Sequence, residues 1–305
     1  MAVTAVVSAV GLVVDDRVLV GAPIWSKPFK FAVSFVAYCL SLAWMLSLLP
    51  RGRRVGWWAG TVVALASLVE MVIITGQAVR GKRSHFNHET PFDEALFNAM
   101  AVTVVVLWTG TLVIAVLLLR ARIADRASAW AIRCGIVLAL AGAAVGFLMT
   151  QPAPGQRRGV SKVVGAHSVG VPDGGPGMPL TGWSTTGGDL RIPHFVGMHA
   201  LQLLPLLVML LAALAPRFAR FADDRVRLRL VLLAAAGYAA AFALVLWQAL
   251  RGQPLTHPDA PTLTAAGLTL TAVTLGTYGI LRAPLPPPGR PTAPENAGTP
   301  KELVP

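Results

Sequence analysis

The chain has 305 residues, of which 55% are hydrophobic and 13% are charged, with a formal net charge of +12. Soluble domains carry about a quarter of charged residues, so this composition excludes a water-soluble globular protein. The Lys and Arg residues lie between apolar runs and not on one folded face, which argues against a nucleic-acid partner and for the lipid bilayer. Cys39 and Cys134 both fall inside apolar runs, so neither a disulfide framework nor a cysteine metal site is expected.

The apolar runs predict an all-α, polytopic transmembrane helix bundle of seven to eight spans. Residues 1–14 are apolar without a preceding Lys or Arg or a clear cleavage site, so we expect a short or truncated first span and no cleaved signal peptide. The later runs are long enough to cross the bilayer, and they must be helical because unpaired backbone groups cannot face lipid. They lie at about 31–49, 56–79, 95–119, 130–150, 194–215, 229–250 and 262–281.

The distribution of Lys and Arg predicts an orientation in the plasma (cell) membrane. The segments 51–54, 120–126 and 217–229, together with the Pro-rich tail 283–305, carry more Lys and Arg than the alternate segments. This set is therefore expected to be cytoplasmic, and the tail is expected to be disordered. The six histidines then lie on or near the outer face: His85, His88, His167, His194, His199 and His257.

Two helix ends repeat one another. Residues 77–81 read QAVRG and residues 248–252 read QALRG, and each motif ends an apolar run. Further weak matches in the same order favour two parallel four-helix halves, residues 1–125 and 126–282. The second half differs by a Gly/Pro-rich insertion, residues 151–193, where function is expected to be concentrated.

The insertion is expected to be an ordered lid at the outer face, with a flexible solvated linker as the alternative. Its glycines and prolines forbid regular structure and allow close backbone approach. It is not a Gly/Ser repeat, however, and it carries Asp173, Trp183, Asp189 and Arg191.

The helix that follows the insertion carries three polar side chains towards the bilayer. His199 and Gln202 are three residues apart and share a helix face, whereas His194 lies near the first turn. Between the two histidines the helix turns by about 140°, so their rings do not converge on one ion. We expect a ligand-binding or proton-handling role for His199, or else an interhelical hydrogen bond.

Residues 80–98 predict a helix start. Thr90 is expected to be the N-cap and Pro91 the first helical residue, which places Asp93 and Glu94 at the positive end of the helix dipole.

The histidines near this start could be metal ligands. His85, His88 and Glu89 offer imidazole and carboxylate groups, and His167 and His194 are the further candidates. Their spacing matches no strong metal-binding signature such as HExxH.

Glu70 is the one acid deep within a predicted span. A lone carboxylate in a membrane is costly unless it is protonated or paired. Gln77 follows two turns later on the same side, and Arg80 is a turn-aligned candidate partner. Glu70 is therefore expected to bind substrate or handle protons, or to make a structural hydrogen bond.

Three functions are compatible with these features. The first is a binding or transport protein for a small solute or ion, with its site on the outer side between the halves. Its expected lining is Glu70, Gln77, Arg80, His199, Gln202 and Gln248. The second is a metal- or haem-dependent membrane enzyme that uses the histidines, and the third is a non-catalytic accessory subunit. The chain has no nucleotide-binding loop or nucleophile elbow, and neither an enzymatic activity nor an oligomeric state is predicted.

The expected pairing of two four-helix halves is similar to that of the haem A synthases, a likeness of architecture alone. Those enzymes need histidines on facing helices in both halves. Here His199 alone lies clearly within a span, and the first half offers no matching histidine.

Overall fold

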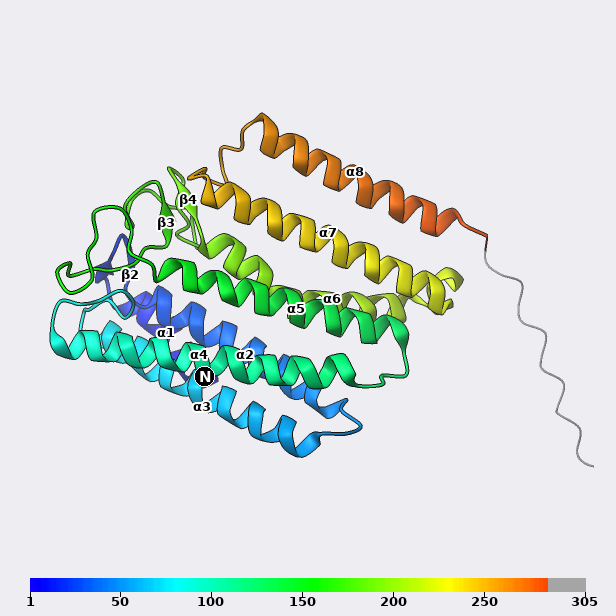
Figure 1. Ribbon diagram of the computed structural model, residues 1–305, viewed down its shortest axis with the longest axis horizontal. Coiled ribbons are helices and arrows are strands. Elements are labelled where there is room, and N and C mark those ends of the chain that lie inside the picture. The colour runs from blue at the N-terminus through cyan, green and yellow to red at the C-terminus, as the bar shows by residue number, and fades with distance from the viewer. Residues whose placement is uncertain (285–305) are drawn as a thin grey trace, which may run out of the picture.

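Seven long helices run side by side in the computed structural model, which describes residues 1–284 (Figure 1). Within that range, each of the seven is long and apolar enough to cross a membrane, which confirms the predicted transmembrane helix bundle. The chain is therefore a multi-pass integral membrane protein. The predicted disordered tail lies almost wholly outside the described residues.

The helices are α1 (Ala2–Val14), α2 (Ser26–Ser47), α3 (Arg53–Val79), α4 (Pro91–Arg120), α5 (Arg126–Met149), α6 (Arg191–Leu214), η1 (Ala219–Ala222), α7 (Asp224–Leu250) and α8 (Ala260–Arg282). Two antiparallel strand pairs join them: β1 (Val18–Leu19) with β2 (Ala22–Pro23), and β3 (Ser168–Val169) with β4 (Gly188–Asp189).

Four helices, α4, α5, α7 and α8, begin in polar flanks where a side chain caps the first turn. The predicted start of α4 is confirmed: Thr90 is the N-cap, Pro91 follows, and the Thr90 hydroxyl accepts a hydrogen bond from the Asp93 amide. Aspartates cap three other helices in the same way: Asp125, Asp223 and Asp259.

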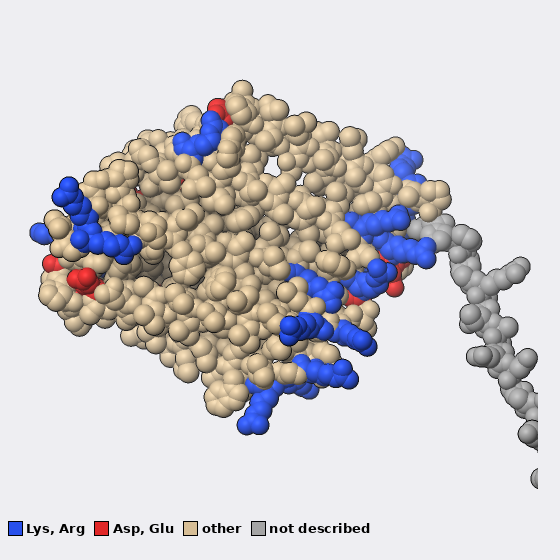
Figure 2. Space-filling view, viewed as in Figure 1, with Lys and Arg blue, Asp and Glu red and all other residues tan. Residues whose placement is uncertain are grey.

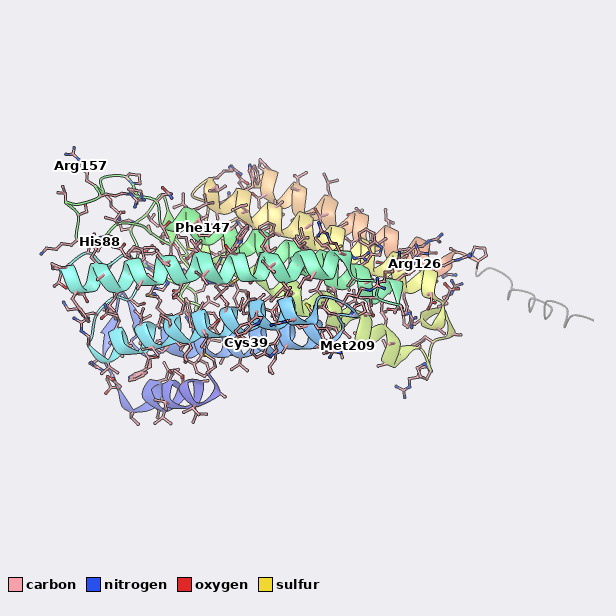
Figure 3. All side chains as sticks on the ribbon, turned by 60° about the horizontal axis from the view of Figure 1, so that its bottom comes forward. Cys39, His88, Arg126, Phe147, Arg157 and Met209 are labelled. Carbon is pink, nitrogen blue, oxygen red and sulfur yellow. The ribbon has the colours of Figure 1, made fainter. Side chains whose placement is uncertain are left out.

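The two ends of the bundle differ in charge and in structure. We call the end that carries residues 80–90 and 150–190 the loop end, and the opposite end the arginine end. The turns of the arginine end are residues 51–54, 120–126 and 217–229. Figure 2 shows Lys and Arg side chains gathered there, and Figure 3 places Arg126 at this end and His88 and Arg157 at the loop end.

The short first segment is helix α1, which is shorter than a full span. Its 13 residues rise about 20 Å, whereas the hydrocarbon core is about 30 Å thick. Helix α1 packs on the start of α2, where Gly11 leaves room for the indole of Trp25. That indole donates a hydrogen bond of 2.7 Å to Asp15, just after α1.

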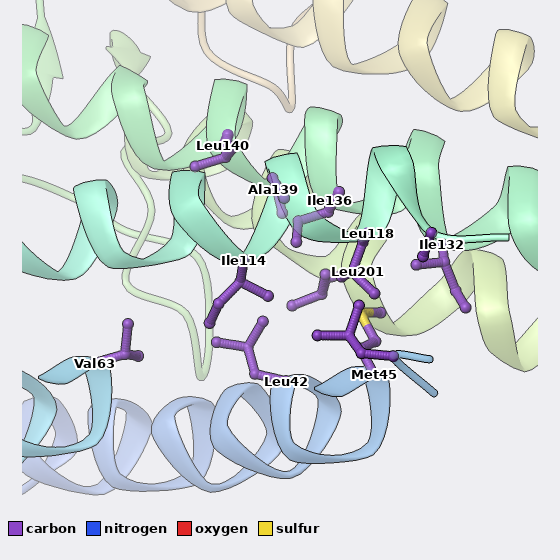
Figure 4. Packing of buried hydrophobic residues seen from close by; sticks show 13 residues of the cluster. Leu42, Met45, Val63, Ile114, Leu118, Ile132, Ile136, Ala139, Leu140 and Leu201 are labelled. Atoms are coloured by element: carbon purple, nitrogen blue, oxygen red, sulfur yellow. The ribbon is translucent and has the colours of Figure 1, made fainter. Parts of the chain in front are cut away.

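The largest buried apolar cluster spans the boundary between the two halves expected from the sequence. Its buried side chains come from α2, α3, α4, α5 and α6 (Figure 4). Helices α5 and α6 are in closest contact where Gly142 faces Gly197, since a Cβ atom added to Gly142 would lie 2.5 Å from the Gly197 Cα. This contact fits the small-residue packing of membrane helices. It also fixes the start of α6, and with it the histidines that α6 carries.

Candidate functional site

The long connection between α5 and α6, residues 151–190, is ordered by pairing with the α3–α4 turn. We call it the cap loop. The His88 amide donates to the Lys162 carbonyl over 2.9 Å, and the Val164 amide donates to the Phe86 carbonyl over 3.2 Å. Phe86 itself is buried and has a φ of +61°, which is a strained conformation for a bulky residue.

Two further contacts hold the cap loop across the bundle. The Lys30 ammonium of α2 donates to the Thr181 carbonyl over 2.9 Å. On the other side, Gly188 lies against the Ala249 carbonyl near the end of α7, so closely that a Cβ atom there would clash. The cap loop therefore contacts elements of both halves.

The polar residues predicted for the lid hold the cap loop together. Asp189 is buried, accepts the Ser184 amide over 2.8 Å, and forms an ion pair of 2.6 Å with Arg191. Arg191 also donates to the Gly182 carbonyl over 2.7 Å. The ring of Trp183 packs edge-on against Phe195 of α6, with centroids 5.7 Å apart.

A second carboxylate closes the turn after β3. Asp173 accepts the ring Nδ1–H of His167 over 2.8 Å and the Ser168 amide over 2.8 Å. Burial alone would raise the pKa of Asp173, but the hydrogen bond and charge of His167 outweigh it and hold that pKa well below its usual range. Burial lowers the pKa of His167 against the opposing effect of Asp173.

Beneath the cap loop, Lys27 and His85 meet on one aromatic ring. The Lys27 Nζ lies 5.8 Å from the centroid of Phe31, and the His85 ring centroid lies 5.8 Å from the same point. Lys27 is half-buried, yet its ammonium makes no hydrogen bond or ion pair with any of residues 1–284.

Basic groups from three other segments lie close enough for their charges to act on His85. Burial holds the pKa of His85 well below 6.5, and the charges of Lys27, His167 and His194 lower it further. These four groups lie on α2, on the α3–α4 turn, in the cap loop and on α6. The fold therefore brings together three of the predicted metal-ligand candidates and a lysine.

The histidines of α6 each use one ring nitrogen. His194 Nδ1 donates to the Gly142 carbonyl over 2.8 Å, and His199 Nδ1 donates to the Phe195 carbonyl over 2.9 Å. A carbonyl only accepts, so both Nδ1 atoms carry hydrogen and both Nε2 atoms are free to accept in the neutral rings.

The remaining metal-ligand candidates pair with other side chains. His88 lies 3.2 Å from Glu94, and Glu89 forms an ion pair with Lys82. Within the described part of the chain, no three His, Cys, Asp or Glu side chains are arranged to hold a metal ion.

Glu70 is buried in α3, with 2% of its surface exposed, and it accepts a hydrogen bond from the Thr103 hydroxyl of α4. The predicted pairing of Glu70 with Arg80 is wrong, because Arg80 instead pairs with Asp93 over 2.7 Å. The reason is geometric: Arg80 is the C-cap of α3, and its side chain reaches across to the first turn of α4.

Gln77 and Arg80 join the end of α3 to the start of α4. Gln77 Nε2 donates to Asp93 over 2.9 Å and to the Arg83 carbonyl over 3.2 Å. Asp93 also accepts from the Thr90 hydroxyl. The side chains of Gln77 and Arg80 therefore make their hydrogen bonds to other groups of the protein.

Gln248 makes the same kind of junction between α7 and α8. Its Nε2 donates to the Pro254 carbonyl, six residues on, as Gln77 does to Arg83. Arg251 pairs with Asp259, the N-cap of α8, which also accepts from the Thr262 hydroxyl. In α4 the N-cap is a threonine and the aspartate follows three residues later. In α8 the N-cap is the aspartate and the threonine follows three residues later.

The predicted lining is thus spread over separate places. Gln77, Arg80 and Gln248 lie in the helix junctions, whereas Glu70 lies within the first half. His199 and Gln202 lie on α6, where the Gln202 Oε1 atom is buried without a hydrogen-bond partner among the described residues.

Lys27, Phe31 and Thr103 were not predicted as site residues from the sequence. Lys27 and Phe31 have one detectable signal, a cation and an aromatic ring four residues apart on one helix face. Their meeting with His85 and the cap loop depends on contacts across the fold.

Comparison of the chain with protein-family models, with curated proteins and with solved structures finds no match.

Proposed function

We propose that this membrane protein binds a small solute at the loop end and carries it into or across the bilayer. The site would lie among Lys27, Phe31, His85 and His194, with the cap loop as its lid. With the loop end outward, as the Lys and Arg distribution predicts, the solute would enter from outside the cell.

The observation that carries the proposal is the Lys27 ammonium. The Lys27 side chain is half-buried, and a charge partly withdrawn from water gains from a hydrogen-bonded partner of opposite charge. Most structural charges of the loop end have such partners, as the pairs Asp189–Arg191 and Lys82–Glu89 illustrate. Lys27 has none among residues 1–284, and it faces side chains from three other segments. A bound solute would supply the missing partner.

Glu70 supports a transport role in addition to binding. It lies one helical turn further from the loop end than Ile74, and Thr103 lies one turn further than Met100. Ile74 and Met100 are buried together and pack against Phe31. An apolar layer therefore separates Lys27 from Glu70, as between an entry site and an inner proton-handling group.

The repeated helix-end motif, QAVRG at residues 77–81 and QALRG at residues 248–252, supports a role for Glu70 beyond folding. Counting back seven residues from Gln77 leads to Glu70, and counting back seven from Gln248 leads to Ala241. The second half repeats the glutamine-to-carbonyl bond and the arginine–aspartate pair, although Gln248 is not bonded to Asp259, and it has no acid at the equivalent depth. The junction thus does not require a carboxylate there.

A panel of small solutes tests this proposal on the purified protein. Neutral, cationic and anionic compounds are added separately, and the thermal unfolding midpoint is recorded for the wild type, Lys27→Met and Lys30→Met. Lys30 is the matched control, since it lies one turn from Lys27 and is exposed. Its loss removes a single hydrogen bond from an exposed side chain to the cap loop, and no group of the proposed site. Proteoliposome uptake of each stabilising solute then distinguishes a carrier from a receptor.

We expect at least one solute to raise the midpoint of the wild type and of Lys30→Met, but not that of Lys27→Met. The proposal fails if no solute stabilises the wild type, or if both lysine variants respond as the wild type does.

A metal- or haem-dependent membrane enzyme is the second candidate. It is favoured by the Nδ1–H bonds of His194 and His199 to backbone carbonyls, the arrangement that orients histidine ligands in metal sites. Metal analysis and a visible absorption spectrum of the purified protein test it. A stoichiometric metal or a haem absorption band would support it, and a colourless, metal-free protein would count against it.

A further inference from the structure

We infer that the solute carries a compact oxyanion, a carboxylate or a phosphate, that Lys27 binds directly beneath the cap loop. This inference rests on the proposed function and adds the chemical class of the ligand. The observation behind it is the balance of charged groups around the ring of Phe31.

The acids near Lys27 are engaged elsewhere. Asp173 accepts hydrogen bonds from His167 and Ser168, and Asp189 pairs with Arg191. Glu70 accepts from Thr103, and its charge acts on Lys27 without a direct ion pair. Among residues 1–284, no carboxylate lies within ion-pair distance of the Lys27 ammonium.

The other charged groups around Lys27 include further cations. Two cations, Arg191 and Arg83, and two acids, Glu70 and Asp173, are close enough for their charges to act on Lys27. Arg83 is half-buried, and its guanidinium has no hydrogen-bond or ion-pair partner in the described part of the chain. Lys27 and Arg83 are therefore two positive charges without a directly bonded acid among residues 1–284, which favour an anion over a neutral or cationic solute.

Neighbouring side chains suit a small anion. His85 and the free Nε2 side of His194 can donate hydrogen bonds once protonated, and an anion favours that protonation. Lysine is a point charge that recognises carboxylates and phosphates alike. The source of the oxyanion is either a free solute or the phosphate of an outer-leaflet lipid whose headgroup is net anionic.

The test has one arm for each source. In detergent, phosphate, sulfate and acetate are titrated at constant ionic strength against chloride, with thermal unfolding as the readout. In nanodiscs, the unfolding midpoint is compared between phosphatidylcholine and phosphatidylglycerol bilayers. Each arm uses the wild type, Lys27→Met and Lys30→Met.

We expect an oxyanion in at least one arm to stabilise the wild type and Lys30→Met. We expect its apparent affinity to fall about tenfold or more in Lys27→Met, the equivalent of about 1.4 kcal/mol. An oxyanion effect that is identical in both lysine variants would overturn the inference.

The solute panel separates the two claims. A neutral or cationic solute that depends on Lys27, without any oxyanion effect, would overturn the ligand class and leave the proposed function standing. No stabilising solute of any charge would overturn both.

Discussion

The hydroxyl of Thr103 on α4 donates a hydrogen bond to the carboxylate of Glu70 on α3, and the pair lies beneath an apolar layer. A carboxylate in such a place is costly when ionised, and it is rarely kept for packing alone. Thr103 also reaches the carbonyls of Ala99 and Met100. Its hydroxyl therefore remains satisfied when the acid is removed.

Replacing Glu70 by Gln should preserve the fold and remove proton exchange at this position. The amide oxygen can accept the Thr103 hydrogen bond, so the free energy of unfolding should change by less than about 1 kcal/mol. Infrared difference spectra between acidic and alkaline buffer should lose a carboxyl band in Glu70→Gln. The exposed Glu94→Gln is the control and should keep that band. An unchanged spectrum in Glu70→Gln would contradict the role of Glu70.

Replacing Asp93 by Ala should destabilise the protein more than replacing Asp259 by Ala. The Asp93 side chain is 0% exposed and that of Asp259 is 33% exposed. Losing Asp93 leaves Gln77 and Arg80 without their acceptor, at a cost of about 2–4 kcal/mol. Losing Asp259 removes an N-cap at a cost of about 1 kcal/mol. Denaturant unfolding in mixed micelles measures both, and equal costs would contradict the assigned burial.

Replacing Gly142 by Ala should loosen the contact between α5 and α6. The added methyl group would meet the Gly197 backbone at 2.5 Å, which predicts a cost of about 1–3 kcal/mol. Gly267→Ala in α8 is the matched control, since nothing lies within 4 Å of its Cβ position. It should be neutral or stabilising by up to about 1 kcal/mol through helix propensity. Thermal unfolding of both variants tests the packing, and a neutral Gly142→Ala would refute it.

The protein should lose stability as the pH falls from about 7 to about 5. The pKa of His85 and that of His167 lie below 6.5 in the folded state, so the unfolded chain binds more protons in this range. His85→Gln should reduce the pH dependence of the unfolding midpoint, whereas the exposed His257→Gln should leave it unchanged. A midpoint that rises towards acidic pH would have the wrong sign for this account.

The fold was largely predictable because each element rests on local physics. Apolar length predicts the spans, and the Thr90–Pro91 pair predicts the start of α4 on capping chemistry alone. The depth of Glu70 followed from its place within an apolar run.

The site was predictable only in part, because its members meet through tertiary contacts. Arg80 is aligned with Glu70 along α3, yet it pairs with Asp93 because the turn brings the next helix closer. Lys27 has no ion-pair partner among residues 1–284, and this depends on how the cap loop folds. The QAVRG and QALRG motifs looked like site residues, but their polar atoms join successive helices.

Hydrogen–deuterium exchange with and without phosphate tests the central claim most directly, because oxyanions could instead bind at the arginine end. The account predicts protection of residues 84–88 and 162–168, where the cap loop pairs with the α3–α4 turn. This protection should be lost in Lys27→Met and kept in Lys30→Met. Protection confined to residues 120–126 and 217–229, or absent throughout, would contradict a ligand site beneath the cap loop.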